Sequence, residues 1–129
     1  METAQLKKGY VQVYTGNGKG KTTASLGLVL RALGAGFKVH VIQFLKKGDY
    51  SEIKALQQFG DQIRVEQFGM GKFVRGNPSE QDMEAGRRGL EKLRQIITEK
   101  ACDVLVIEEG NVAITCGLFT VEELLEAIA

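Results

Sequence analysis

The residues most suited to chemistry in this chain form one glycine-rich segment with a lysine and two hydroxyl side chains at its end. Glycines let consecutive backbone N–H groups converge on one anion, and a helix N-terminus placed behind them adds positive charge. Lys21 would neutralise phosphate oxygens, and the Thr22 hydroxyl would hold a magnesium ion. The segment therefore predicts a phosphate-binding loop for a nucleotide. Its residues are Gly16, Asn17, Gly18, Lys19, Gly20, Lys21, Thr22 and Thr23.

The spacing of this loop departs from the commonest phosphate-loop pattern. G-x-x-x-x-G-K-[ST] would place a glycine at position 15, where the chain has Thr15, and only Gly20-Lys21-Thr22 match its second half. We interpret the segment as a variant phosphate loop. The alternative is a glycine-rich turn before a capped helix, which would need neither a lysine at position 21 nor two hydroxyls after it.

Two acidic residues follow the apolar run 104–107, and a carboxylate at the end of a buried strand is what a nucleotide-bound metal requires. Glu108 occupies that place, where most phosphate-loop proteins have the shorter aspartate. Glu109 is the second candidate for the role. The alternative is a pair of solvated acids at a strand end.

The elements that must position these residues alternate along the chain. Strands are predicted at 10–14, 37–44, 63–68 and 103–107, and helices at 22–35, 50–59, 79–101 and 120–128. The segments 49–52, 79–82 and 120–123 resemble capping boxes. This order implies right-handed crossovers and an α/β fold with a mainly parallel sheet and helices on both faces. The continuously apolar run 103–107 predicts a central strand.

The end of the chain looks truncated relative to this architecture. The last predicted helix places Val121, Leu124, Leu125 and Ile128 on one apolar side, yet no further strand follows it. We expect a homodimer, or a loose C-terminus, to compensate for the missing strand.

Composition limits the class of protein. The chain has 129 residues, 43% of them apolar, and a net charge of +1, which predicts one domain over residues 1–129 without a field that recruits nucleic acid or anionic lipid. No apolar run suits a membrane span, and the chain is expected to be cytoplasmic. Cys102 and Cys116 are expected to be buried and reduced. The single histidine, His40, is expected to be structural, so any metal would be nucleotide-bound magnesium.

The loop and its flanks resemble the ATP:corrinoid adenosyltransferases of the cobalamin pathway, whose phosphate loop has the same shortened glycine spacing. The resemblance covers most of the chain. It runs from residues 9–23 through Leu26-Gly27, Leu30-Arg31-Ala32, Gly34-Ala35-Gly36 and Gln43-Phe44-Leu45-Lys46 to Asn111-Val112-Ala113 and Gly117-Leu118.

This resemblance implies a homodimeric, RecA-like phosphate-loop fold that transfers the adenosyl group of ATP to the cobalt(I) of a reduced corrinoid and releases triphosphate. It also implies an external flavin-dependent reductase as a partner. The implied ATP contacts are the loop 16–23, Arg31, Lys46 and Asn111, and Thr22 and Glu108 would hold magnesium. Arg31 also suits simple helix-dipole complementation. The candidate catalytic set is Lys21, Phe73 and Glu109, with Phe73 placed against the corrin.

Three features depart from the family pattern. The acidic segment reads Glu108-Glu109-Gly110 instead of Asp-Glu-Ile or Asp-Glu-Leu, and Arg75 stands where a tryptophan is common. The family's later Thr-Gly-Arg segment has no counterpart in this sequence. A phosphate-loop hydrolase or kinase, and a non-catalytic nucleotide- or corrinoid-binding relative, therefore remain the alternative functions.

Overall fold

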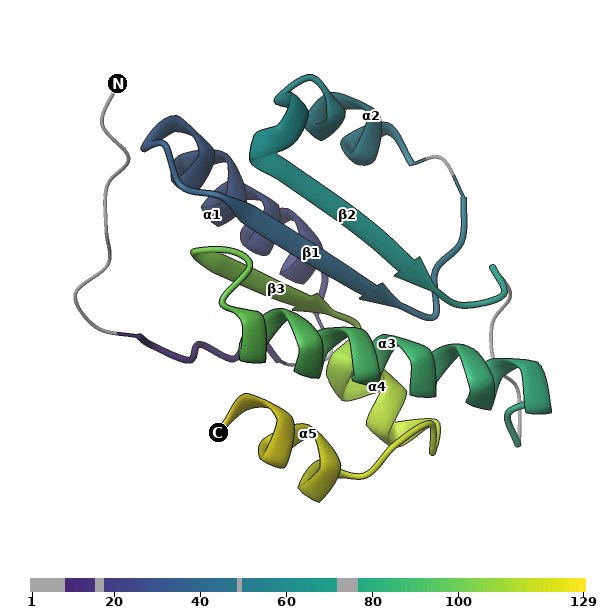
Figure 1. The fold of residues 1–129 in the computed structure, drawn as a ribbon. Coiled ribbons are helices and arrows are strands. Elements are labelled where there is room, and N and C mark those ends of the chain that lie inside the picture. The colour runs from purple at the N-terminus through teal and green to yellow at the C-terminus, as the bar shows by residue number, and fades with distance from the viewer. Residues whose placement is uncertain (1–8, 16–17, 49, 72–76) are drawn as a thin grey trace.

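The computed structural model describes residues 9–15, 18–48, 50–71 and 77–129, and its strands form one parallel sheet flanked by helices (Figure 1). Strand β1 (Val39–Phe44) lies between β2 (Ile63–Phe68) and β3 (Val104–Glu108). Both strand pairs are parallel, so their carboxyl ends meet at one edge of the sheet. The predicted α/β class and parallel sheet are confirmed.

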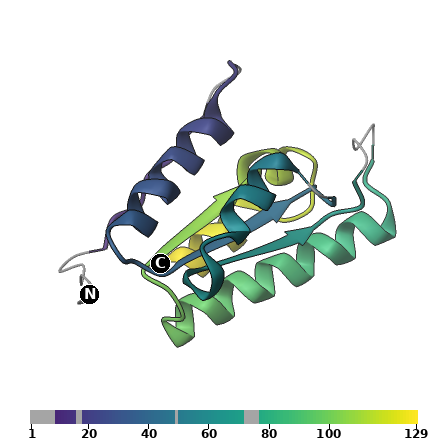
Figure 2. The ribbon, with the colours of Figure 1, turned by 90° about the horizontal axis from the view of Figure 1, so that it is seen from above.

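Helices cover both faces of the sheet, as predicted (Figure 2). Because alternate side chains of a strand point to opposite faces, β1 supplies both apolar cores. Val39 and Val41 pack with α1 and α2, whereas Ile42 and Phe44 pack with α3, α4 and α5. The helices are α1 (Lys21–Gly34), α2 (Ser51–Gln57), α3 (Glu80–Glu99), α4 (Gly110–Thr115) and α5 (Val121–Ile128), with a 3-10 turn at Gly60–Gln62.

Two of the three predicted capping boxes are confirmed. The Ser79 hydroxyl accepts from the backbone N–H of Asp82 at the start of α3, and Thr120 accepts from Glu123 at the start of α5. In each box the acidic side chain returns a bond to the backbone of the capping residue. Helix α2 differs, because its N-cap is Tyr50 without a side-chain bond, and Asp49 lies outside the described residues.

The predicted strand at residues 10–14 is wrong for this structure. Residues 9–15 form neither helix nor strand, and Val11 and Val13 are 69% and 67% exposed. Alternating apolar residues show which faces a strand could bury, but a strand also needs the edge of a neighbouring strand. In the described part of the chain, nothing pairs with this segment in the sheet.

The predicted central position of the 103–107 strand is also wrong. β1 is the central strand and is buried at every position, whereas β3 pairs only with β1 among the described strands. Helices above and below β3 explain its apolar run, because hydrophobic patterning reports covered faces and not covered edges. The short helix α4 was not predicted, since six residues carry too little periodicity.

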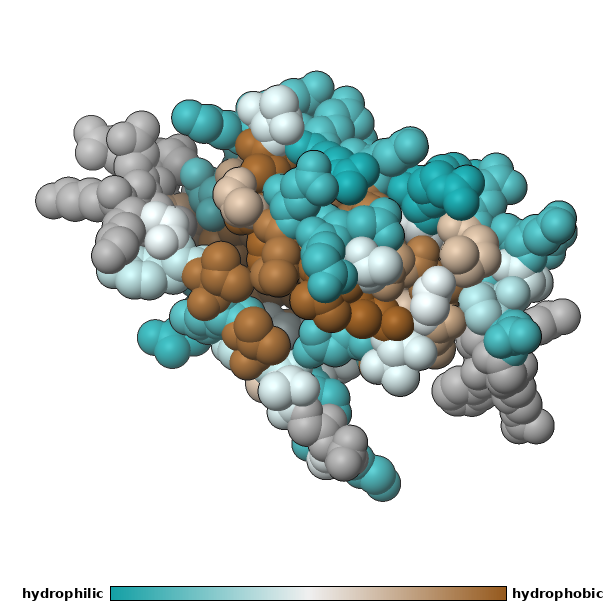
Figure 3. All heavy atoms as spheres, turned by 90° about the horizontal axis from the view of Figure 1, so that it is seen from below, coloured by the Kyte–Doolittle hydropathy of each residue, from teal (hydrophilic) through white to brown (hydrophobic). Residues whose placement is uncertain are grey.

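The apolar side of α5 is only partly covered. Leu124 and Ile128 pack against the α3 core, but Val121 and Leu125 are 48% and 55% exposed. Figure 3 shows hydrophobic side chains gathered on the face of the molecule where α5 lies. Both cysteines are free thiols that are half-buried, not fully buried as expected. Burial raises the pKa of the Cys102 thiol. Within the described residues, no helix is long and apolar enough to cross a membrane.

Candidate functional site

The Glu108 carboxylate is the centre of the candidate site. It ends β3, and its side chain is 6% exposed. Oε1 accepts a hydrogen bond from the Thr22 hydroxyl at 2.9 Å and also contacts the Lys46 ammonium, while Oε2 accepts from the Gln43 amide. A buried carboxylate is tolerated because three donors satisfy its charge. The structure therefore brings together Glu108, Thr22 and Lys46, which the sequence analysis selected separately.

Two glutamines extend this arrangement across the sheet. Gln43 pairs in register with Gln67 on β2 and with Glu108 on β3, so the three side chains lie in one row on the α1 face. Gln67 donates to the Gln43 side-chain oxygen at 3.0 Å, and Gln43 donates onward to Glu108. Gln43 has no exposed surface. The row fixes the orientation of the Glu108 carboxylate through a chain of oriented amides.

The turn that carries Lys46 is held by backbone contacts. Leu45 has a left-handed φ of 62°, which redirects the chain at the end of β1. A Cβ on Gly69 would lie 2.5 Å from the backbone of Leu45 and Lys46, so only glycine permits this approach. Gln67 also binds both the N–H and the C=O of Gly48, at 2.9 and 3.0 Å. The same glutamine thus orders the Lys46 turn and the Glu108 row.

The described part of the glycine-rich loop leads directly into α1. Gly20 is the N-cap with φ 102°, a conformation that glycine adopts freely and other residues rarely do. Lys21 begins the helix and donates to the Gly18 carbonyl at 2.7 Å. A Cβ on Gly18 would meet nothing within 4 Å, so the space beside the loop is open to a ligand. The expected strand before the loop is missing, but the helix N-terminus and its lysine are in place.

Several predicted residues lie apart from this centre. Arg31 is exposed in the last turn of α1, ten residues and about 15 Å of helix beyond Lys21. Asn111 is exposed on α4, and its carbonyl accepts from Thr115. Lys19 and Thr23 are exposed close to the loop. Four residues of interest, Gly16, Asn17, Phe73 and Arg75, lie outside the described residues.

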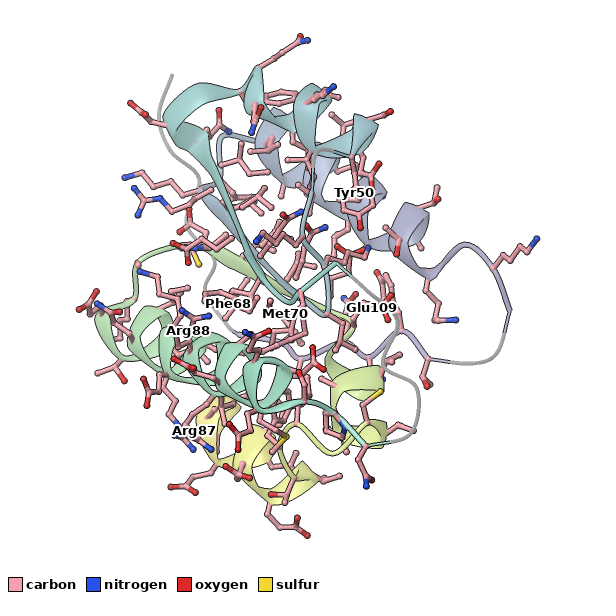
Figure 4. All side chains as sticks on the ribbon, turned by 90° about the vertical axis from the view of Figure 1, so that its right-hand side faces the viewer. Tyr50, Phe68, Met70, Arg87, Arg88 and Glu109 are labelled. Atoms are coloured by element: carbon pink, nitrogen blue, oxygen red, sulfur yellow. The ribbon has the colours of Figure 1, made fainter. Side chains whose placement is uncertain are left out.

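Glu109 differs from Glu108 in conformation and burial. It is the N-cap of α4 with a left-handed φ of 63°, and it is half-buried. Figure 4 shows Glu109 and Tyr50 at the same edge of the molecule as the start of α1. A non-glycine residue in this conformation is strained, and such strain is commonest at functional sites. The side chain is thus near the centre without taking part in the Glu108 row.

The donor set suits magnesium bound together with a phosphate. A carboxylate oxygen and a hydroxyl 2.9 Å apart are hard oxygen ligands of the kind that magnesium prefers. In the described ranges, no group of three or more histidine, cysteine, aspartate or glutamate residues could hold a metal alone. A metal at Thr22 and Glu108 would therefore need further oxygens from a nucleotide and from water.

Sequence reasoning missed Gln67 and Tyr50 as members of this region. Gln67 became relevant only through the register of the parallel strands, which places it beside Gln43. The Tyr50 ring lies 5.6 Å from the Lys46 ammonium, a cation–π distance. The pattern Gln43, Gln67 and Glu108 at matching strand positions was a usable signal, because polar residues are unusual at the ends of buried strands.

A second concave feature lies elsewhere. A surface pocket of about 440 Å³ between α3 and α5 is lined by Met83, Arg87, Leu90 and Phe119, among others. It shares no lining residue with the Glu108 centre, and the labelled Arg87 in Figure 4 marks its side of α3. The described structure gives it no polar cluster comparable to that around Glu108.

A parallel α/β sheet with a glycine-rich loop entering the first helix defines a phosphate-loop protein of RecA-like fold. The chain belongs to the family described as ATP:corrinoid adenosyltransferase BtuR/CobO/CobP, which it matches over residues 7–129.

Curated relatives support this assignment. The corrinoid adenosyltransferase of Escherichia coli K12 is 32% identical over 127 residues, covering 97% of this chain and 63% of that protein. Corrinoid adenosyltransferase CobA of Salmonella typhimurium LT2 is 31% identical with the same coverage, and the Pseudomonas aeruginosa PAO1 protein is 28% identical over 97% and 62%. The chain thus spans less than two thirds of the length of these relatives.

Proposed function

We propose that this chain transfers the adenosyl group of ATP to the cobalt(I) of a reduced corrinoid and releases triphosphate. The observation that carries the proposal is the junction of Thr22, Glu108 and Lys46 at the N-terminus of α1, in a chain of the corrinoid adenosyltransferase family. Thr22 and Glu108 are the proposed magnesium ligands. Lys21, Lys46 and the amides of the loop 16–23 are the proposed phosphate contacts, with Arg31 and Asn111 as outer candidates.

The reaction explains which groups the site needs. Cobalt(I) attacks the ribose C5′ carbon, a cobalt–carbon bond forms, and the C5′–oxygen bond breaks with its electron pair leaving on triphosphate. The leaving group gains negative charge, so Lys21 and the helix N-terminus would stabilise it. Magnesium, when bound, would supply Lewis-acid neutralisation of the same oxygens. No water has to be activated, so Glu109 need not act as a hydrolytic base.

The chain's other contribution would be to position the two substrates and to exclude water. Phe73 is the proposed corrin contact, supported only by its place in the family pattern. We also propose a homodimer and an external flavin-dependent reductase, which the family pattern implies. The exposed Val121 and Leu125 on α5 support a partner for that face. Sedimentation of the wild type beside Leu125→Glu would test the dimer.

Phosphorus NMR of the products tests the reaction. ATP and reduced corrinoid should give adenosylated corrinoid and intact triphosphate in equal amounts, with little ATP consumed when corrinoid is left out. ADP with orthophosphate would favour a hydrolase, and a phosphorylated acceptor would favour a kinase. Unchanged ATP in the presence of bound nucleotide and reduced corrinoid would favour a non-catalytic binding protein.

A further inference from the structure

Lys46 contacts the same carboxylate oxygen that a metal would use. Its ammonium binds Glu108 Oε1, which also accepts from Thr22, and its side chain is only 19% exposed. The Tyr50 ring covers the ammonium from another side. Without ligand, this lysine therefore supplies the positive charge that a buried carboxylate requires.

A divalent cation and an ammonium cannot share this oxygen at low energy. Both are positive, and repulsion between them is strong where solvent screening is weak. The backbone around Lys46 is held by Gly69, Gln67 and the left-handed Leu45, so the turn is restrained. The side chain has a flexible four-carbon stem and can reorient without it.

We propose that Lys46 is an exchangeable counter-ion, which the divalent cation displaces from Glu108 and which then binds the anion that enters with the metal. This inference rests on the proposed nucleotide site. It gives Lys46 two opposed effects: its ammonium competes with the metal alone but favours the metal–triphosphate complex. A lysine that only stabilises the fold would not have opposite effects on the two ligands.

The test measures two affinities in the full chain. Mn²⁺ alone is titrated by electron paramagnetic resonance, and ATP with Mg²⁺ by calorimetry. Lys46→Met should bind Mn²⁺ roughly tenfold more tightly than wild type, and Mg–ATP roughly tenfold more weakly. Lys46→Arg keeps the charge and should bind Mn²⁺ as weakly as wild type does. Lys47→Met, at the exposed neighbouring lysine, is the matched control and should leave both affinities unchanged.

Unchanged or weaker Mn²⁺ binding by Lys46→Met overturns the proposal. A wild-type measurement keeps the test valid if this variant does not fold. Millimolar Mn²⁺ without nucleotide should increase acetylation of the Lys46 amine several-fold, and Mg–ATP should protect it. Absence of that increase also overturns the proposal. The proposed adenosyl transfer fails by a different sign, because its failure appears as unchanged ATP in the product spectrum while these affinities keep the expected order.

Discussion

The two faces of the sheet each hold a glutamate beside cationic groups, but the two arrangements differ. On the α1 face, Glu108 is 6% exposed and sits at the carboxyl end of β3 with donors from α1, β1 and the turn after β1. On the α3 face, Glu66 is 28% exposed, bonds His40 at 3.2 Å and lies 3.8 Å from the Lys92 ammonium. Phe68 and Arg88, labelled in Figure 4, lie on the same side as Glu66.

The difference shows how position on the sheet separates a functional carboxylate from a structural one. Glu108 lies where loops from several elements converge, which is where ligands of open parallel sheets bind. Glu66 lies within β2 under a long helix, and its partners come from neighbouring packed elements. Charge alone does not distinguish the two residues, whereas the open space beside Gly18 and the adjacent helix N-terminus do.

The largest expected effect comes from removing each charge in turn. Glu108→Gln should lower the rate of adenosyl transfer by about 100-fold or more, because two charged contacts of roughly 1.5–3 kcal/mol each lose their carboxylate. Glu66→Gln should stay within about threefold of wild type, since its bonds are partly solvated. Initial rates of corrinoid adenosylation measure both, and similar losses in the two variants would erase the proposed distinction.

A smaller effect is expected at the loop. Lys21→Ala should weaken ATP binding by about 10- to 150-fold, from the loss of roughly 1.5–3 kcal/mol of charge-assisted bonding. Calorimetric titration measures this, with circular dichroism to show that the fold is kept. Lys54→Ala, at an exposed position of α2, is the control. Equal affinities for Lys21→Ala and wild type would reject the loop as the phosphate site.

Packing of the two faces is compared by two alanine substitutions in helices. A Cβ on Gly89 in α3 would lie 2.4 Å from the Phe44 ring, so Gly89→Ala should destabilise the fold by about 1–3 kcal/mol. A Cβ on Gly27 in α1 meets nothing within 4 Å, so Gly27→Ala should stabilise by about 0.4–1 kcal/mol through helix propensity. Urea unfolding curves of both variants decide it; a stabilising Gly89→Ala would mean that α3 packs less closely than described.

The smallest effect concerns His40 on the α3 face. Burial lowers the pKa of His40 below its ordinary value of 6.5, although Glu66 acts in the opposite direction. The unfolded chain then binds the proton more readily, so stability falls as pH drops below about 6.5. His40→Gln should reduce this decline. Unfolding midpoints at about pH 7.5 and about pH 5 measure it, and an unchanged decline would assign the pH dependence to other groups.

Local signals predicted the parts of this molecule that depend on neighbouring residues. The boxes Ser79–Asp82 and Thr120–Glu123 mark helix starts because a hydroxyl and a carboxylate three residues apart satisfy the free N–H groups. Alternating and continuous apolar runs located the three observed strands. The short α4 and the N-cap of α2 escaped, since neither leaves a strong local pattern.

Residue types and local order by themselves determined the glycine-rich loop, the helix behind it and a carboxylate at a strand end. Only the tertiary structure decided that β1 is central, that residues 10–14 lack a pairing edge, and that Lys46 contacts Glu108. The physical reason is separation: Thr22 and Gln43 stand 86 and 65 residues from Glu108, and strand register and helix packing bring them to it. Local propensity carries no information about register, because register depends on which distant strand edges meet.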